Sequence, residues 1–157
     1  MSGRVAARLA ELGITLPDVA APVAAYVPAV QSGIHVLTSG QLPFVDGALP
    51  ATGKVGTGPD DVSPERAAEL ARVAALNAVA AVRSLVGDLD SVVRVVKVVG
   101  FVASQPDFTG QPGVINGAST VLGEIFGDAG VHARSAVGVA VLPLDSPVEV
   151  EIMVEVG

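Results

Sequence analysis

Residues 132–143 have the sequence HARSAVGVAVLP, and residues 148–152 have the sequence VEVEI. Small or apolar residues alternate with polar ones at a period of two, and valine is frequent, which is typical of half-buried β-strands. The segment between the two stretches begins with Pro143 and ends with Pro147, so we expect a turn there. The pattern therefore predicts two neighbouring strands around which the rest of the chain is built.

Arg134 stands at the start of the first of these strands, in a chain with 9 Lys plus Arg and 16 Asp plus Glu. Its planar guanidinium carries a fork of donors that can bind a carboxylate through two parallel hydrogen bonds. One interpretation is therefore a site for a carboxylate-bearing ligand. The other is a surface or interface ion pair, for which Glu149 on the neighbouring strand is the nearest acidic candidate.

The bulk properties limit the possible classes of protein. The 157 residues suit one domain with one core, and with 50% hydrophobic but only 3% aromatic residues we expect a core of Ala, Val and Leu. The high apolar fraction also predicts that copies of the chain cover part of one another's surface. A net charge of −7 argues against a nucleic-acid partner. The absence of Cys excludes disulfides, thiolate catalysis and cysteine metal sites.

Several other kinds of site and segment are not expected. The amino terminus is charged and no apolar run of about twenty residues occurs, so we expect a cytoplasmic protein without a membrane partner. His35 and His132 are far apart in the sequence, which argues against a metal site. The stretch TGKVGTG over 52–58 resembles a phosphate-binding loop only superficially, because Val55 follows the lysine where Ser or Thr is required.

Hydrophobic periodicity, prolines and glycines predict the secondary structure. The expected elements are a helix over 2–12 capped by Ser2 and ended by Gly13, a proline-rich extended connector over 14–30, a strand over 33–39 ended by Gly40, a loop over 44–61, a helix from Ser63 and Pro64 to about Val86, a strand over 92–103, and a helix from Asn116 or Gly117 to Phe126. We treat 1–157 as a single domain, with the amino-terminal helix and connector over 1–25 and a core over 26–157.

This order of elements predicts an α+β fold in which two helices cover one face of a mixed β-sheet. The other face would be rich in Val and Ala. Such a face needs a cover, so the pattern again favours association between copies of the chain.

Four blocks of sequence, in this order, resemble the RidA family, the YjgF-like reactive intermediate/imine deaminases. The blocks are Tyr26-Val27-Pro28-Ala29-Val30, Thr38-Ser39-Gly40-Gln41-Leu42-Pro43, Ala133-Arg134-Ser135 with Val139-Ala140-Val141-Leu142-Pro143, and Val148-Glu149-Val150-Glu151. The resemblance covers roughly residues 20–156 and implies a chorismate-mutase-like fold. It also implies a homotrimer with a central barrel and a cleft between each pair of subunits. The amino-terminal helix is an addition relative to archetypal members.

The resemblance assigns roles to individual residues. Arg134 would bind the substrate carboxylate, and Glu149 would position or activate a water for attack on an imine carbon. The remaining residues implied around the ligand are Tyr26, Ser39 with Gly40, Asn116, and the backbone of Ala136, where archetypal members often have Cys. Gly138 stands where those members often have Glu, and the glycine-rich segment around Lys54 departs from the shorter ones, so the substrate range is left open.

Residue chemistry alone leaves other roles open for several of these residues. Tyr26 could serve packing, Ser39 could belong to a strand-ending turn, and Asn116 could cap a helix. Glu151 projects to the same strand face as Glu149 and is an alternative for the functional acid.

The implied activity is hydrolysis of enamine/imine intermediates such as 2-aminoacrylate to a 2-keto acid and ammonia. An imine is already electrophilic, so orientation of the carboxylate, placement of a water and proton transfer suffice, and we expect neither metal nor cofactor. The alternative is a non-catalytic trimer that binds small carboxylic metabolites in the same cleft. The ribonuclease activity that some family names carry conflicts with the acidic composition and the lack of a basic groove or paired histidines.

Overall fold

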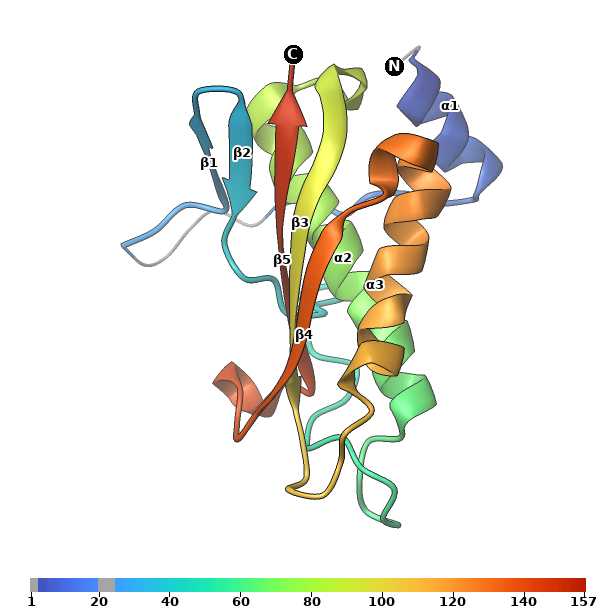
Figure 1. Ribbon diagram of the computed structural model, residues 1–157, viewed down its shortest axis with the longest axis vertical. Helices are drawn as coiled ribbons and strands as arrows, with labels where there is room; N and C mark the ends of the chain where they lie inside the picture. The colour runs from blue at the N-terminus through green and yellow to red at the C-terminus, as the bar shows by residue number, and fades with distance from the viewer. Residues whose placement is uncertain (1–2, 20–24) are drawn as a thin grey trace.

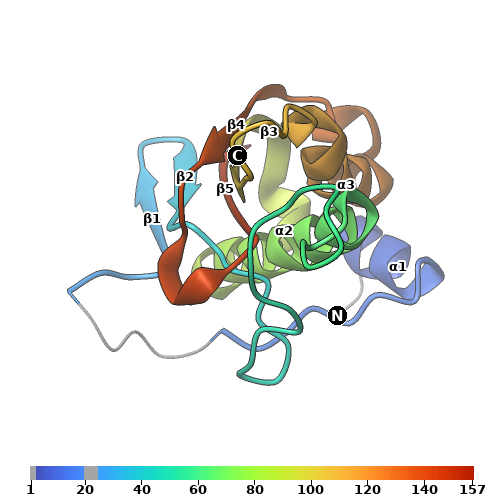
Figure 2. The same ribbon diagram turned by 90° about the horizontal axis from the view of Figure 1, so that it is seen from below.

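The structure is a computed structural model that describes residues 3–19 and 25–157. In these residues a five-stranded sheet of order β1-β2-β5-β3-β4 has its helices on one face (Figures 1 and 2). The elements are α1 (Arg4–Glu11), β1 (Ala29–Ser32), β2 (His35–Thr38), α2 (Pro64–Val86), β3 (Val92–Ala103), α3 (Gln111–Phe126), β4 (Ala133–Val139) and β5 (Val148–Val156), with 3-10 turns over Leu89–Ser91, Gly127–Gly130 and Pro143–Asp145.

The sheet is mixed, as predicted, but its last two strands do not pair as predicted. Strand β4 pairs with β3 in parallel, whereas β5 is antiparallel to both β3 and β2. The prediction that the two strands are neighbours is therefore wrong, because β3 lies between them (Figure 1). The turn Pro143–Asp145, where Leu144 has a φ of +58°, carries the chain from the sheet edge past β3. The parallel pairing of β3 with β4 needs a crossover, which α3 supplies.

Helix α2 begins and ends where the sequence predicts. The Ser63 hydroxyl accepts a hydrogen bond from the Arg66 backbone N–H at 3.1 Å, Pro64 occupies the first turn, and Gly87, with a φ of +79°, ends the helix. Its buried face consists mostly of alanines. Small residues also allow α2 and α3 to approach closely, because a Cβ on Gly117 would lie 1.9 Å from the Ala68 carbonyl oxygen. The expected core of Ala, Val and Leu is confirmed in the described residues.

Two element boundaries differ from the predictions. Residues 29–32 form β1 and not the end of the connector, and Gly33, with a φ of +60°, turns the chain into β2. Strand β1 is a short edge strand with three exposed residues, so it lacks the alternating apolar pattern. Helix α3 begins at Gln111, not at Asn116, because Pro112 lies in its first turn, where a missing N–H has no cost.

Helix α1 is held against the helical layer by a residue far away in the sequence. Residue Ser2, the predicted cap, lies outside the described residues, and the N-cap position is Gly3. The Asp90 carboxylate instead accepts hydrogen bonds from the backbone N–H groups of Arg4 and Val5, both at 2.8 Å. Val5 and Leu9 then pack into the core. Figure 2 shows α1 beside the end of α3.

The two faces of the sheet differ in what covers them. On β5, Val148, Val150, Ile152 and Val154 are buried beneath the helices. The alternate residues Glu149, Glu151, Met153 and Glu155 lie on the opposite face, which we call the bare face, together with the exposed side chains of Val30 and Val137. Within residues 3–19 and 25–157, none of the helices combines the length and hydropathy that crossing a membrane requires.

Candidate functional site

Arg134 is held by the helix that packs beside its strand. It pairs in the β4 register with Val98, whose side chain is buried under the helices, so the two side chains share the helical face. One nitrogen of the guanidinium, Nη1, donates to Asn116 Oδ1 at 2.7 Å and to Ser119 Oγ at 3.2 Å. Both hydrogens of Nη1 are thereby used. The Nε–Nη2 edge makes no hydrogen bond to the described residues.

Arg134 forms no ion pair with an acidic residue in the described part of the chain. The ion pairs there join Arg8 to Glu11, Arg66 to Glu69, and Arg72 to Glu124. The interpretation in which Arg134 pairs with Glu149 within one chain is therefore wrong. The positive charge of this partly buried guanidinium therefore has no acidic partner in the described residues, and its open edge matches the two oxygens of a carboxylate.

A serine and a histidine extend this arrangement behind Arg134. The Ser119 Oγ lies 2.9 Å from His132 Nε2, and His132 Nδ1 lies 2.6 Å from the Gly130 carbonyl oxygen. Ser119 was not among the predicted site residues, and His132 was considered only as a metal ligand. Ser119 follows Asn116 by three residues, a spacing that places both on one side of a helix, and this was the one available indication.

Glu149 belongs to a different cluster, which forms where the chain leaves β2. The backbone of Gln41 exchanges two hydrogen bonds with that of Val150, at 2.8 and 3.0 Å, and this pairing places Gly40 beside Glu149. A Cβ on Gly40 would come within 2.7 Å of Glu149 Cδ. Burial raises the pKa of the Glu149 carboxyl, and the nearby charge of Glu151 raises it further. Glu149 is thus a carboxyl group whose proton affinity is increased.

The predicted residues Tyr26 and Ser39 lie near this second cluster. The Ser39 hydroxyl donates to the Val27 carbonyl at 2.6 Å, and the Ser39 N–H donates to the Pro28 carbonyl at 2.8 Å. These bonds fix the backbone that follows Tyr26 against Ser39, because Tyr26 directly precedes Val27. Tyr26 is 59% exposed, so it does not pack in the core of the chain.

Within one chain, the predicted site residues form two groups on opposite faces of the sheet. Arg134 and Asn116 lie on the helical face at the β4 edge. Ala136 joins them, since it pairs with Gly100, where a Cβ would meet the Ile115 side chain of α3. Glu149 lies on the bare face with Gly40. A small molecule cannot touch both Arg134 and Glu149 of the same chain, because the sheet lies between them.

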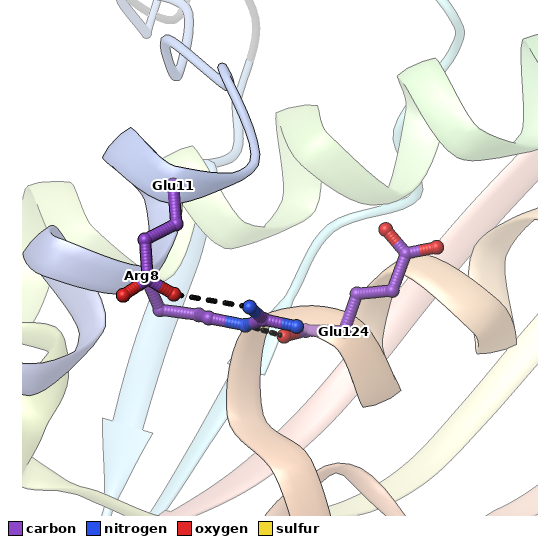
Figure 3. Close-up of polar contacts among 3 residues, drawn as sticks. All are labelled: Arg8, Glu11 and Glu124. Atoms are coloured by element: carbon purple, nitrogen blue, oxygen red, sulfur yellow. Dashed lines mark hydrogen bonds and ion pairs between the residues drawn. The ribbon is translucent and has the colours of Figure 1, made fainter.

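Two hollows in the surface lie away from these residues. One groove of about 410 Å³ runs between α1 and the end of α3, and it is lined by Arg4, Arg8, Glu11 and Phe126 among others. There, Arg8 Nε donates to the Glu124 backbone carbonyl at 2.8 Å while Nη1 pairs with Glu11 at 3.1 Å (Figure 3). A second hollow of about 360 Å³ lies beside the β1–β2 turn. Neither includes a predicted site residue.

Metal ligands do not gather in the part of the chain that the structure describes: three or more His, Asp or Glu side chains nowhere come together there. Arg134 and Glu149 present two different functional groups. One group carries a fixed positive charge with a free donor edge, and the other is a carboxyl group of raised pKa.

The chain is similar to a known protein family and to several individual proteins. Residues 6–156 match the family described as "YjgF/chorismate mutase-like, putative endoribonuclease". Protein TCP17 of Trypanosoma cruzi is 47% identical over 157 residues, covering 99% of this chain and 96% of its own. The crystal structure of Atu1372 from Agrobacterium tumefaciens, a protein of unknown function, has 42% identity and a TM-score of 0.88 over 98% of this chain and 93% of its own. A "putative endoribonuclease" from Shewanella oneidensis MR-1 has 32% identity and a TM-score of 0.91 over 97% and 99%.

Proposed function

Because the chain belongs to the YjgF/chorismate mutase-like family, we propose that it is an imine deaminase whose sites lie between copies of the chain. Its substrates would be enamine/imine intermediates of the 2-aminoacrylate type, and its products a 2-keto acid and ammonia. The reaction requires no group beyond those of the chain and water.

The observation that carries this proposal is the open donor edge of Arg134. Its Nη1 is engaged by Asn116 and Ser119, both neutral, so the positive charge has no acidic partner in the described residues. Holding an unpaired, partly buried charge in one orientation is costly, and a bound carboxylate would offset that cost. The Nε–Nη2 edge would bind it in bidentate fashion.

The separation of Arg134 from Glu149 supports a site shared by two subunits. Since the sheet lies between these side chains within one chain, a ligand that touches both must take Arg134 from one copy and Glu149 from another. The bare face that carries Glu149 also exposes Val30 and Val137, at 50% and 43% of their surface, and association would bury them. We propose the homotrimer with a central barrel as the assembly that brings these surfaces together.

The chemistry follows from the two groups. Arg134 would orient the substrate carboxylate, and the Glu149 carboxylate would take a proton from water as the water oxygen attacks the imine carbon. With the imine protonated on its nitrogen, this attack gives a neutral carbinolamine. Returning the proton from Glu149 to the carbinolamine nitrogen lets ammonia leave, and the hydroxyl proton passes to water as the carbonyl forms. The raised pKa of Glu149 makes it a stronger base than an ordinary carboxylate, which suits both transfers.

The names of the family and of one relative include endoribonuclease, but the charge of this chain favours a small substrate. With 9 Lys plus Arg against 16 Asp plus Glu, the chain lacks the positive excess that binding to phosphate backbones draws on. A single carboxylate needs only one guanidinium, and Arg134 meets that requirement.

A coupled assay tests the proposal. A PLP-dependent dehydratase generates 2-aminoacrylate from serine, and the appearance of pyruvate is followed with the wild type, with Arg134→Ala, and with Arg66→Ala as the control. Arg66 pairs with Glu69 on the exposed side of α2, so its loss should leave the rate unchanged. We expect acceleration by the wild type and the control but not by Arg134→Ala.

A wild type that is a folded oligomer by light scattering yet fails to accelerate pyruvate release would overturn the deaminase proposal. Binding of pyruvate that depends on Arg134 in that same protein would instead establish a non-catalytic binder of small carboxylates. The deaminase and the non-catalytic binder would use the same edge of Arg134, so the turnover measurement distinguishes between them.

A further inference from the structure

We infer that Ser119 and His132 are positioning residues that hold the Arg134 guanidinium with its Nε–Nη2 edge free for a carboxylate, an inference that rests on the proposed function. Three hydrogen bonds in series support it. They join Arg134 Nη1 to Ser119 Oγ at 3.2 Å, Ser119 Oγ to His132 Nε2 at 2.9 Å, and His132 Nδ1 to the Gly130 carbonyl at 2.6 Å.

The directions of these bonds follow from the chemistry of the groups. A carbonyl oxygen only accepts, so the hydrogen between Gly130 and His132 must be on Nδ1. In a neutral ring Nε2 then accepts, and the Ser119 hydroxyl donates its single hydrogen to it. The lone pairs of Ser119 Oγ are thereby left to accept from Arg134. The opposite tautomer would set the Nδ1 lone pair against the Gly130 oxygen, which is repulsive at 2.6 Å.

The chain of bonds restricts how Arg134 can turn. Asn116 is exposed and supplies one acceptor for Nη1, which alone leaves the guanidinium free to pivot about that contact. Ser119 supplies the second acceptor, and two contacts on one nitrogen fix the plane and the orientation of the group. A guanidinium fixed before binding loses less conformational freedom when a ligand arrives, so affinity rises without any new ligand contact.

The alternative role for a hydrogen-bonded Ser–His pair is a nucleophile with its base. The position of Ser119 argues against that role, because it lies within α3 (Gln111–Phe126), where the backbone N–H groups are used by the helix. An acyl-transfer site needs free donors aimed at the developing oxyanion. The contact with Arg134 gives the Ser119 hydroxyl a use that needs no such donors.

The test compares variants at both positions in two measurements, the Kd of pyruvate by calorimetry and the kinetic constants of the coupled assay. Ser119→Ala should raise both the Kd and the KM about tenfold with kcat little changed, the size expected for one hydrogen bond to a charged group. Ser119→Thr keeps the hydroxyl and should restore the wild-type values. His132→Phe should resemble Ser119→Ala, whereas His132→Gln, which can supply an amide acceptor, should lie near the wild type.

Matched controls exist for both side chains. Ser84 on α2 donates only to the Ala81 carbonyl, so Ser84→Ala should leave the Kd and KM unchanged. His35 is the other histidine, on β2. His35 pairs with Glu155 on the bare face, away from Arg134, so His35→Phe should leave carboxylate binding intact when light scattering shows the wild-type assembly. Equal Kd values for Ser119→Ala and the wild type, alongside lost binding in Arg134→Ala, would overturn the inference.

A spectroscopic readout keeps this inference separate from the proposed function. Nitrogen NMR at mildly alkaline pH should show the hydrogen of the His132 ring on Nδ1, and Ser119→Ala should speed exchange of the Arg134 Nη hydrogens. Both follow from the hydrogen bonds and need no turnover. If the wild type neither turns over nor binds pyruvate, the proposed function fails, but the inference fails only if the hydrogen is on Nε2 or the Arg134 exchange is unchanged.

Discussion

The carboxyl group of Glu149 occupies the space that a side chain on Gly40 would fill. A Cβ at Gly40 would lie 2.7 Å from Glu149 Cδ and 3.0 Å from Oε2. The backbone pairing of Gln41 with Val150 holds the two segments at this separation, and Asn77 of α2 donates to the Leu42 and Phe44 carbonyls to anchor the chain that follows. A residue with a side chain at this position must displace Glu149.

Gly40→Ala should therefore reduce turnover by at least about tenfold while costing at most about 1 kcal/mol of unfolding free energy, because the end of the Glu149 side chain can move aside. The coupled assay and urea unfolding measure the two effects. Gly113→Ala is the control, because nothing lies within 4 Å of its Cβ position on α3. Normal turnover in Gly40→Ala would mean that the position of Glu149 does not matter.

The pH dependence of turnover should report Glu149. Its pKa is raised by burial first and by Glu151 second, so the activity of a general base should fall on the acid side at a higher pH than an ordinary Glu would give. Glu151→Gln removes the second cause, and the acid limb of the pH–rate profile should move to lower pH. An unmoved limb would show that another group controls it.

The raised pKa of Glu149 also makes the folding stability of the protein depend on pH. The folded protein binds the proton of Glu149 more tightly than the unfolded chain, where the pKa is 4.5. Stability should therefore decrease as pH rises from 4.5 through the raised folded pKa, and Glu149→Gln should remove that part of the dependence. Urea unfolding across this range checks the sign of the pH dependence.

We also expect Glu149→Gln to abolish turnover while leaving pyruvate binding intact.

The sequence predicted the elements better than their partners. The valine-rich run over 92–103 and the Ser63–Pro64 helix start are local patterns, and both were confirmed. Strand alternation determines which side chains of a strand share a face, but it does not determine which strand pairs with it. The pairing of β4 with β3 could therefore not be predicted from the alternation. The short strand β1 was missed because an exposed edge strand has no apolar alternation.

The same limit explains how much of the candidate site could be predicted. Arg134 and Glu149 were identified by residue type and family resemblance, but their placement on opposite faces depends on β3 lying between their strands. The contact of Gly40 with Glu149 depends on the Gln41–Val150 pairing, which joins segments far apart in the chain. Ser119 has no distinctive pattern around it, and only its distances to His132 and Arg134 reveal it.

The amino-terminal helix should depend on Asp90. The backbone N–H groups of Val5 and Arg4 lower the pKa of the Asp90 carboxyl, which means that the carboxylate form is favoured in the folded chain. The contribution of the Asp90 carboxylate to folding stability is present above its unfolded pKa of 3.8 and is lost as the pH falls through the lower folded pKa. Asp90→Asn should accelerate hydrogen exchange of the α1 amides selectively, with Asp88→Asn as a neighbouring comparison. Equal protection of α1 in Asp90→Asn and the wild type would contradict this role.

The contact between α2 and α3 should be the least tolerant of added volume. A Cβ on Gly117 would lie 1.9 Å from the Ala68 carbonyl oxygen, and backbone cannot yield as the end of a flexible side chain can. Gly117→Ala must therefore force the two helices apart, which also displaces Asn116 and Ser119 relative to Arg134. We expect a loss of about 3 kcal/mol in unfolding free energy and weaker carboxylate binding.

Gly123→Ala, also on α3 but with nothing within 4 Å of its Cβ position, should instead be neutral or stabilising, since alanine favours a helix more than glycine does. Similar unfolding midpoints for the two variants would mean that the helices can separate without loss, and the close approach would then have no part in positioning Arg134.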